Sequence, residues 1–227
     1  MSESLNSLLA DLHAQRLSTW EPEALQVNID QRKRLVNEAQ TEQYVQVGDT
    51  LLPFTLLKVE GGNLNSDELL AKGPAVLIFF RFAGCPACNI ALPYYQRRLY
   101  PRLQAMGVPL VAISPQVRER LIEIKTRHNL ALQVASDPEN QLGRRLGILY
   151  SFDEPSRNVA LAKGASIGEI TGTGTWELPQ PAVVVIDSDG TVAFAEVSPD
   201  WLVRTEAEPV IQAVEKLLAP ALVPASI

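Results

Sequence analysis

The clearest hydrophobic pattern in the chain is the uninterrupted apolar run AVLIFF at residues 75–80. Gly73-Pro74 precedes this run and Gly84 follows it, so the pattern predicts a strand that is buried on both faces of a sheet. The residues from Pro86 to Met106 then have apolar positions at helical spacing, with Pro86 in the first turn, where a missing N–H costs little. A strand, a tight loop and a helix are therefore expected in that order.

The same alternation continues after Gly107. Residues 108–114 and 132–136 are predicted strands, residues 115–129 are a predicted helix, and a further helix runs from Asp137 to near Gly147. Alternation of this kind is typical of βαβ units with parallel strands. Residues 180–197, QPAVVVIDSDGTVAFAEV, instead predict an antiparallel hairpin that turns at Asp187-Ser-Asp-Gly190. The fold class is thus α/β, with a central mixed sheet flanked by helices.

Three other segments complete the expected organisation. Residues 1–45 have apolar positions at helical spacing and predict a helical N-terminal extension. Residues 46–220 form the main domain, and the Gly/Ser/Thr-rich passage within 148–180 is interpreted as an insertion that leaves the core. A last helix is expected from about Glu206 to Leu218, and residues 221–227 are a short tail.

Composition and charge exclude some classes of binding partner. The net charge is −6 and there is no Lys/Arg-rich run, which argues against nucleic acid. The longest apolar run, residues 75–80, is far shorter than the roughly 20 residues that span a bilayer, so we expect no membrane segment. The N-terminus has neither the basic residues nor the apolar stretch of a secretory signal, and a cytoplasmic location is expected.

The chain has two cysteines, Cys85 and Cys88, three residues apart at the predicted start of a helix. The unpaired N–H groups and the positive end of the helix dipole lower the pKa of a thiol placed there, so Cys85 is expected to be the more acidic and the more exposed thiol. Cys88 is close enough to form a disulfide with it. The alternative is a pair of small buried hydrophobic side chains. Zinc would need two further ligands, and His13 and His128 lack ligand-spaced neighbours, so neither a metal nor another cofactor is expected.

The order strand, Cys-Pro-x-Cys, helix, with Pro93 eight residues after Cys85, resembles thioredoxin-fold proteins. Gln180-Pro181, directly before VVVID, is similar to the cis-proline that faces the cysteine pair in that family, so the resemblance makes Pro181 a candidate for a cis bond beside Cys85. Pro86 and Arg81 are the other candidate supporting residues.

Within that superfamily the chain resembles peroxiredoxin-like proteins of the alkyl hydroperoxide reductase and thiol-specific antioxidant group. The resemblance rests on VGDTLLPFTL, FFRFAGCPACNIAL, VAISPQ, SDPENQLGRRLGI and WELPQPAVVVIDSDGTV, in this order over residues 47–197. Typical members have a threonine or serine three residues before the reactive cysteine and a proline four residues earlier, whereas this chain has Phe82 and Ile78. The arginine that polarises the peroxide in that family is not evident, and Arg81 is a candidate substitute.

The resemblance implies a thiol peroxidase in which Cys85 attacks a hydroperoxide and Cys88 resolves the product as an intramolecular disulfide. A thioredoxin- or glutathione-type donor would then reduce the disulfide, and a homodimer is compatible with the sequence. Two alternatives use the same pair of cysteines. One is a thioredoxin-like protein-disulfide reductase, and the other is a redox-sensing module in which the pair only changes state.

Overall fold

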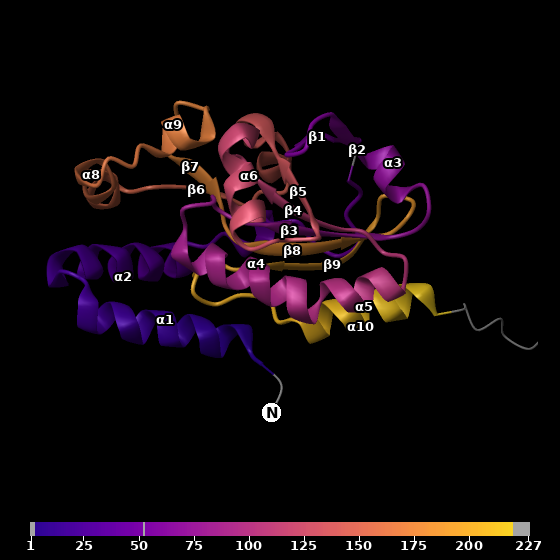
Figure 1. Cartoon of the computed structure of the whole chain (residues 1–227), viewed down its shortest axis with the longest axis horizontal. Coiled ribbons are helices and arrows are strands. Elements are labelled where there is room, and N and C mark those ends of the chain that lie inside the picture. The colour runs from indigo at the N-terminus through magenta and orange to yellow at the C-terminus, as the bar shows by residue number, and fades with distance from the viewer. Residues whose placement is uncertain (1–2, 52, 220–227) are drawn as a thin grey trace, which may run out of the picture.

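The computed structural model describes residues 3–51 and 53–219, and the predicted tail 221–227 lies outside the described residues. Helices and strands alternate along most of the chain (Figure 1). The α-helices are α1 (Leu5–Thr19), α2 (Pro22–Asn37), α3 (Ser66–Leu70), α4 (Pro86–Arg98), α5 (Tyr100–Ala105), α6 (Arg118–Arg127), α7 (Gln141–Arg145), α8 (Glu154–Ala162), α9 (Ile167–Thr171) and α10 (Ala207–Leu218). Two short 3-10 helices cover Thr41–Gln43 and Pro138–Asn140. The strands are β1 (Thr55–Lys58), β2 (Asn63–Asn65), β3 (Ala75–Phe79), β4 (Leu110–Ser114), β5 (Gln133–Ser136), β6 (Leu149–Ser151), β7 (Glu177–Pro179), β8 (Ala182–Ile186) and β9 (Val192–Val197).

A seven-stranded mixed sheet forms the centre of the molecule, in the order β2-β1-β5-β4-β3-β8-β9. β3 pairs in parallel with β4, and β4 pairs in parallel with β5, as the βαβ pattern predicts. β8 is antiparallel to both β3 and β9, which confirms the predicted hairpin. Since β3 lies between β4 and β8, all five of its residues are buried, and the predicted central strand is confirmed.

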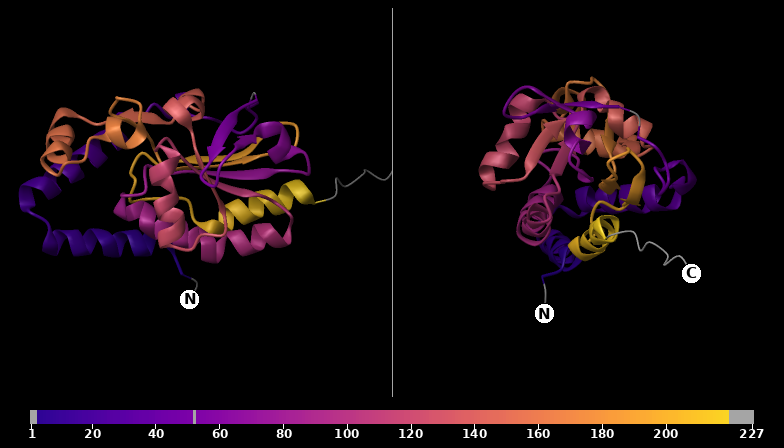
Figure 2. Two further views of the ribbon diagram at one scale, coloured as in Figure 1. Left: turned by 45° about the horizontal axis from the view of Figure 1, so that its top comes forward. Right: turned by 90° about the vertical axis from the view of Figure 1, so that its right-hand side faces the viewer.

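The pleat of β3 divides its side chains between two hydrophobic clusters. Val76 and Ile78 face the larger cluster, which includes side chains of α1, α4, α6 and α10. Ala75, Leu77 and Phe79 face the opposite cluster, in which α3 and α7 take part. This division follows from the alternation of side chains along a strand. The chain therefore has a central mixed sheet with helices on both faces, which confirms the predicted fold class (Figure 2).

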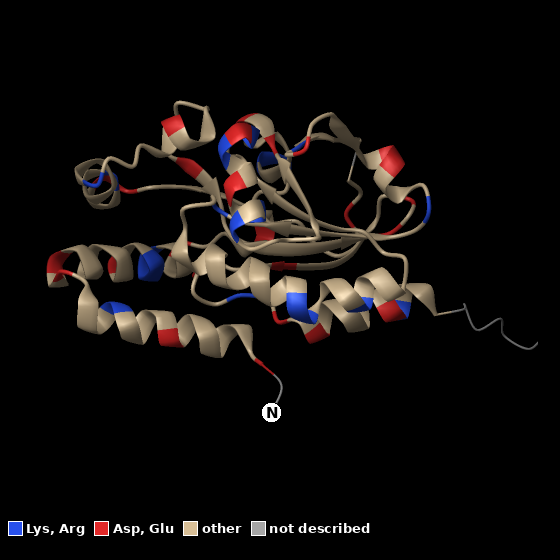
Figure 3. Ribbon diagram, in the orientation of Figure 1, with Lys and Arg blue, Asp and Glu red and all other residues tan. Residues whose placement is uncertain are grey.

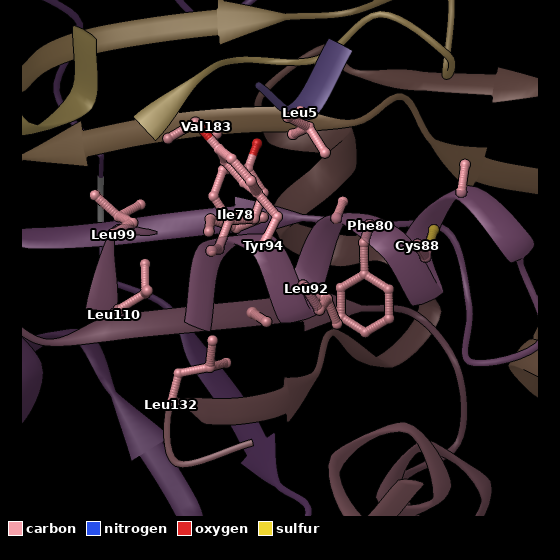
Figure 4. Packing of buried hydrophobic residues seen from close by; sticks show 14 of the residues in the cluster. Leu5, Ile78, Phe80, Cys88, Leu92, Tyr94, Leu99, Leu110, Leu132 and Val183 are labelled. Atoms are coloured by element: carbon pink, nitrogen blue, oxygen red, sulfur yellow. The ribbon is translucent and has the colours of Figure 1, made fainter. Parts of the chain in front are cut away.

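The N-terminal helices α1 and α2 both pack onto the larger cluster, and α2 contributes Leu35 to it. Leu5 and Leu9 of α1 are fully buried in it, and Figure 4 shows Leu5 together with Tyr94 and Ile78. Glu206, next to α10, accepts hydrogen bonds from the backbone N–H groups of Leu5 and Asn6 at the start of α1. A carboxylate at that position satisfies donors that have no partner within the helix. The extension is thus joined to the sheet domain by both apolar packing and a capping carboxylate.

Residues 148–180 form regular secondary structure, and part of this segment packs into the core. β6 and β7 form a separate two-stranded antiparallel sheet, and α8 and α9 lie between them in the sequence. Side chains from this segment enter the larger cluster, among them Tyr150, Ile167 and Leu178. The expectation that the passage lies outside the core is therefore wrong for these side chains. Figure 1 shows α8 and α9 at the same end of the molecule as the turn between α1 and α2.

Candidate active site

Cys85 lies at the junction between the loop that follows β3 and the helix α4. It is the N-cap residue of α4, and Pro86 occupies the first turn, as predicted. The loop is held by hydrogen bonds at both ends: the Ala83 N–H donates to Gln116 Oε1 (2.7 Å), and the Asn89 amide donates to the carbonyl oxygens of Ala83 and Cys85 (2.7 and 2.9 Å). These bonds fix the position of the Cys85 sulfur relative to α4.

Both sulfurs are buried. Cys85 and Cys88 are 1% and 0% exposed, and both are free thiols. The expected difference in exposure is therefore absent, because the larger hydrophobic cluster covers both sulfurs, whereas Pro86 between them is exposed. Figure 4 shows Cys88 close to Phe80 at one end of this cluster.

The two thiols differ in acidity in the predicted direction. Burial alone raises the pKa of Cys85, but this effect is outweighed by the hydrogen bond from the Cys88 thiol, the charges of Arg81 and Arg204, and the Cys88 backbone N–H. The pKa of Cys85 is consequently well below the usual value for a thiol. Burial and the neighbouring Cys85 sulfur hold the pKa of Cys88 well above that value. Cys85 is therefore the more acidic thiol of the pair, and its thiolate accepts a hydrogen bond from the Cys88 thiol.

Arg81 lies directly beside Cys85, with Nη1 3.9 Å from Sγ. Its guanidinium is 4.3 Å from the ring centroid of Trp201 and is also close to the rings of Phe152 and Tyr150. Cation–π contacts of this kind stabilise a buried cation. Although burial lowers the pKa of Arg81, Tyr150 and Cys85 raise it above its ordinary value, so the guanidinium stays charged. Arg81 is thus a buried partner of the thiolate and not a surface arginine.

A second buried arginine, Arg204, was not identified from the sequence. Its Nη2 is 3.4 Å from the Cys88 sulfur, and its Nε donates to the Trp201 carbonyl oxygen (3.0 Å). Asn6 of α1 holds the Arg204 backbone on both sides, since it accepts from the Arg204 N–H and donates to the Arg204 carbonyl oxygen (2.8 Å each). The contact joins residues that are 116 positions apart, and the sequence offers only an isolated arginine in an otherwise apolar and acidic stretch as a signal.

The prediction of a cis bond at Pro181 is wrong, because the described residues contain no cis peptide bond. Gln180 N–H donates to the Ile148 carbonyl oxygen (2.8 Å), and Ser198 N–H donates to the Pro181 carbonyl oxygen (2.8 Å). These bonds guide the chain from β7 into β8, and a trans bond is the lower-energy form unless the structure requires otherwise. Pro181 and Arg204 both line a small cavity of about 10 Å³, which places Pro181 near the arginine that contacts Cys88.

The two positions where the chain departs from the typical peroxiredoxin pattern carry no hydroxyl toward the thiolate. Ile78 is a buried residue of β3, and the Phe82 ring lies 5.6 Å from the Arg81 guanidinium. Tyr94 and Tyr95 of α4 direct their hydroxyls elsewhere: Tyr94 donates to Glu206 and Tyr95 to the Thr205 carbonyl oxygen (2.7 Å each). The nearest polar support for Cys85 is therefore its sulfur partner and the two guanidinium groups.

The described part of the chain contains no cluster of three or more His, Cys, Asp or Glu side chains that is able to hold a metal ion. His128 Nε2 lies 2.7 Å from Asn89 Oδ1, where it supports the residue that anchors the cysteine loop.

Within residues 3–51 and 53–219, no helix has both the length and the apolar character needed to cross a bilayer. Lys/Arg and Asp/Glu are interspersed over the helices in the view of Figure 3.

The mixed sheet with a Cys-Pro-x-Cys pair at the start of α4 places the chain in the thioredoxin-like class of folds. The family model described as "AhpC/TSA family" matches residues 47–195, and the chain belongs to this family. It is 25% identical over 126 residues to peroxiredoxin bcp1 of Schizosaccharomyces pombe, a match that covers 56% of this chain and 63% of that protein.

Solved structures of other proteins share the fold, and two of them illustrate the likeness. Peroxidoxin BcpB from Mycobacterium tuberculosis superposes with a TM-score of 0.59 at 18% identity, over 77% of this chain and 99% of that one. Reduced Prx3 from Vibrio vulnificus, solved in complex with H₂O₂, superposes with a TM-score of 0.59 at 22% identity, over 75% of this chain and 99% of that one.

Proposed function

We propose that this protein is a thiol peroxidase that reduces a hydroperoxide through Cys85. The observation that carries the proposal is the buried Cys85 sulfur, which lies within reach of one guanidinium directly and of a second through Cys88, an arrangement that lowers the pKa of this thiol. A thiolate is the reactive form of cysteine, and fixed positive charge stabilises the negative charge that develops on the leaving oxygen. Membership of the AhpC/TSA family supports the same reaction.

In the first step the Cys85 thiolate attacks the terminal oxygen of the hydroperoxide. An S–O bond forms, the O–O bond breaks, and the electron pair leaves on the alkoxide or hydroxide, which takes up a proton from water. Cys85 becomes a sulfenic acid and the peroxide is reduced to an alcohol or water. Arg81, 3.9 Å from the sulfur, is in position to donate to the peroxide oxygens.

In the second step Cys88 resolves the sulfenic acid. Its sulfur forms a bond to the Cys85 sulfur, the S–O bond breaks, and the departing hydroxide leaves as water with the Cys88 proton. Arg204, 3.4 Å from the Cys88 sulfur, stabilises the developing Cys88 thiolate. Two electrons from a thioredoxin- or glutathione-type thiol donor return the disulfide to the two thiols. Because both sulfurs are buried, this donor requires the first turn of α4 to open.

Burial also separates the proposal from the protein-disulfide reductase alternative. With an exposure of 1%, the Cys85 sulfur is accessible to a small peroxide more readily than to a disulfide within another folded protein. Phe82 leaves the site without the hydroxyl that typical peroxiredoxins have three residues before the reactive cysteine, so we expect slower turnover than in those proteins.

The proposal is tested by peroxide consumption with a dithiol reductant supplied. The wild type is expected to consume hydroperoxide, Cys85→Ser to be inactive, and Cys88→Ser to accumulate sulfenic or overoxidised Cys85 for want of a resolving thiol. A wild type that leaves hydroperoxide intact but reduces a model protein disulfide would instead establish the reductase. Normal cycling of Cys88→Ser would show that resolution comes from another thiol.

A further inference from the structure

A cavity of about 110 Å³ lies between α2 and α8, and Arg81 is one of its lining residues. α2 belongs to the N-terminal extension and α8 to the 148–180 segment, and Figures 1 and 2 show the two helices next to each other. The residues that line the cavity are Trp20, Ala24, Val27, Asn28, Gln31, Arg81, Phe152, Ser156, Val159, Ala160 and Lys163. The cavity therefore reaches the arginine that contacts Cys85.

Four of the lining residues carry a buried polar atom that has no hydrogen-bond partner. These atoms are Arg81 Nε, Gln31 Nε2, Asn28 Oδ1 and Ser156 Oγ. Gln31, Arg81 and Ser156 are only 2%, 7% and 7% exposed. An unpaired buried donor costs about 1–3 kcal/mol, so such groups are normally satisfied in a folded protein. Their concentration around one cavity gives a bound molecule several polar groups to pair with.

The charged residues that line the cavity are all positive. Arg81 and Lys163 line it, and none of its lining residues is acidic. Trp20 has Lys163 Nζ at 4.6 Å and the Arg16 guanidinium at 4.8 Å from its ring centroid. Arg16 is 5% exposed, and its Nε and Nη1 have no hydrogen-bond partner. Buried cations without a carboxylate partner favour an anionic ligand.

The remaining walls are apolar and come from Trp20, Val27, Phe152 and Val159. A cavity of about 110 Å³ that opens past the exposed Lys163 holds only a compact apolar group, of at most one ring, with the rest of the molecule in the opening. From this combination we propose that the cavity binds a small carboxylate with a compact apolar body. The apolar body lies between Trp20 and Val159, and the carboxylate accepts hydrogen bonds from Arg81 and Gln31.

Such a ligand would act on the cysteine site through Arg81, which is shared between the cavity and the Cys85 thiolate. A carboxylate on Arg81 competes with the sulfur for the guanidinium and adds a second negative charge nearby. The thiolate form of Cys85 is then less stable, and the thiol reacts more slowly at mildly acid pH. This inference goes beyond the proposed peroxidase and does not require that activity.

The test uses benzoate as the probe and benzamide, which has the same shape without the charge, as its control, with binding to the full chain followed by calorimetry. Benzoate is expected to bind saturably, and benzamide at least about tenfold more weakly, because a hydrogen bond to a charged group is worth more than one between neutral groups. Gln31→Leu is expected to weaken benzoate about tenfold. Saturating benzoate is expected to slow the alkylation of Cys85 several-fold.

Two variants of α8 serve as a matched pair. Ala160→Phe fills the cavity and is expected to abolish benzoate binding, whereas Leu161→Phe places the same side chain at an exposed position outside the cavity and is expected to leave it unchanged. Circular dichroism checks that both variants fold. If Ala160→Phe does not fold, the proposal is tested with Gln31→Leu instead. Absence of benzoate binding, equal binding of benzamide, or full binding by a folded Ala160→Phe would each overturn the proposal.

Discussion

Replacing Arg81 with glutamine removes the positive charge closest to the Cys85 sulfur and keeps a side chain of similar length. For unit charges 3.9 Å apart at an effective dielectric constant of about 20, the attraction between the guanidinium and the thiolate is about 4 kcal/mol. That energy corresponds to about three pKa units, since one unit is about 1.4 kcal/mol. Arg204 and the Cys88 N–H remain in place, so we expect the pKa of Cys85 to rise by about one to three units.

The pKa of Cys85 is measured from the rate of alkylation by iodoacetamide as a function of pH, in a Cys88→Ser background in which only Cys85 reacts. Arg97→Gln is the matched control, because Arg97 is exposed and pairs with Glu3, and it is expected to leave the midpoint unchanged. If Arg81→Gln moves the midpoint by less than about half a unit, the guanidinium does not stabilise the thiolate and the electrostatic account of the site is wrong.

Two further predictions concern the packing that surrounds the site. Glu206 accepts hydrogen bonds from the start of α1 and from Tyr94, which together outweigh burial and lower its pKa from 4.5 to about 2. Because this pKa is depressed in the folded state, the carboxylate contributes stability above pH 4.5 that is lost as the pH falls towards 2. Glu206→Gln is expected to reduce the free energy of unfolding by about 1–2 kcal/mol at neutral pH, a value discounted for solvent screening, and urea denaturation should show this difference shrinking in acid; a difference that stays constant down to the lower pH would contradict the assignment. Gly147 has φ +70°, and a Cβ there would lie 2.1 Å from the Gln43 carbonyl oxygen. Gly147→Ala is expected to lower the melting temperature clearly more than Gly164→Ala, since Gly164 has a similar φ of +67° with no atom within 4 Å of the added Cβ; equal shifts for the two variants would show that the backbone contact at Gly147 is not restrictive.

The order of the central elements followed from the sequence because each depends on local pattern. The run at residues 75–80 has no polar residue and has Gly-Pro before it, a pattern typical of a strand buried on both faces, as β3 is. The hairpin β8–β9 was marked by β-branched residues and a turn at Asp187–Gly190. β6 and β7 were not predicted, because each has three residues and they pair across 25 intervening positions, so neither has a periodic signal of its own.

The site was predicted only as far as it depends on neighbouring residues. Cys85, Pro86 and Cys88 lie within one helical turn, and their spacing predicted the position and the relative acidity of the thiols. Arg204 reaches Cys88 only through the tertiary fold, with Asn6 of the N-terminal extension holding its backbone. The same covering by distant elements explains why Cys85 is buried, which local sequence cannot show.

The aromatic surroundings of Arg81 had no recognisable sequence signal either. Tyr150, Phe152 and Trp201 come from two segments of the chain about fifty positions apart, and they converge on the guanidinium only after β6 and the loop before α10 are in place. The expectation of a cis bond at Pro181 rested on a family resemblance. In this chain the bond is trans, and the backbone N–H groups of Gln180 and Ser198 hold the segment by hydrogen bonds.

The central claim is that Cys85 is the thiol that reacts with peroxide and that Cys88 resolves it. The most direct measurement is the mass of the fully reduced protein after one equivalent of hydroperoxide, compared with the two single cysteine variants. We expect the wild type to lose two hydrogen atoms as the Cys85–Cys88 disulfide forms, Cys88→Ser to gain one oxygen atom on Cys85, and Cys85→Ser to keep its mass. An oxygen atom added to Cys88 in Cys85→Ser, or an unchanged wild type, would contradict the account.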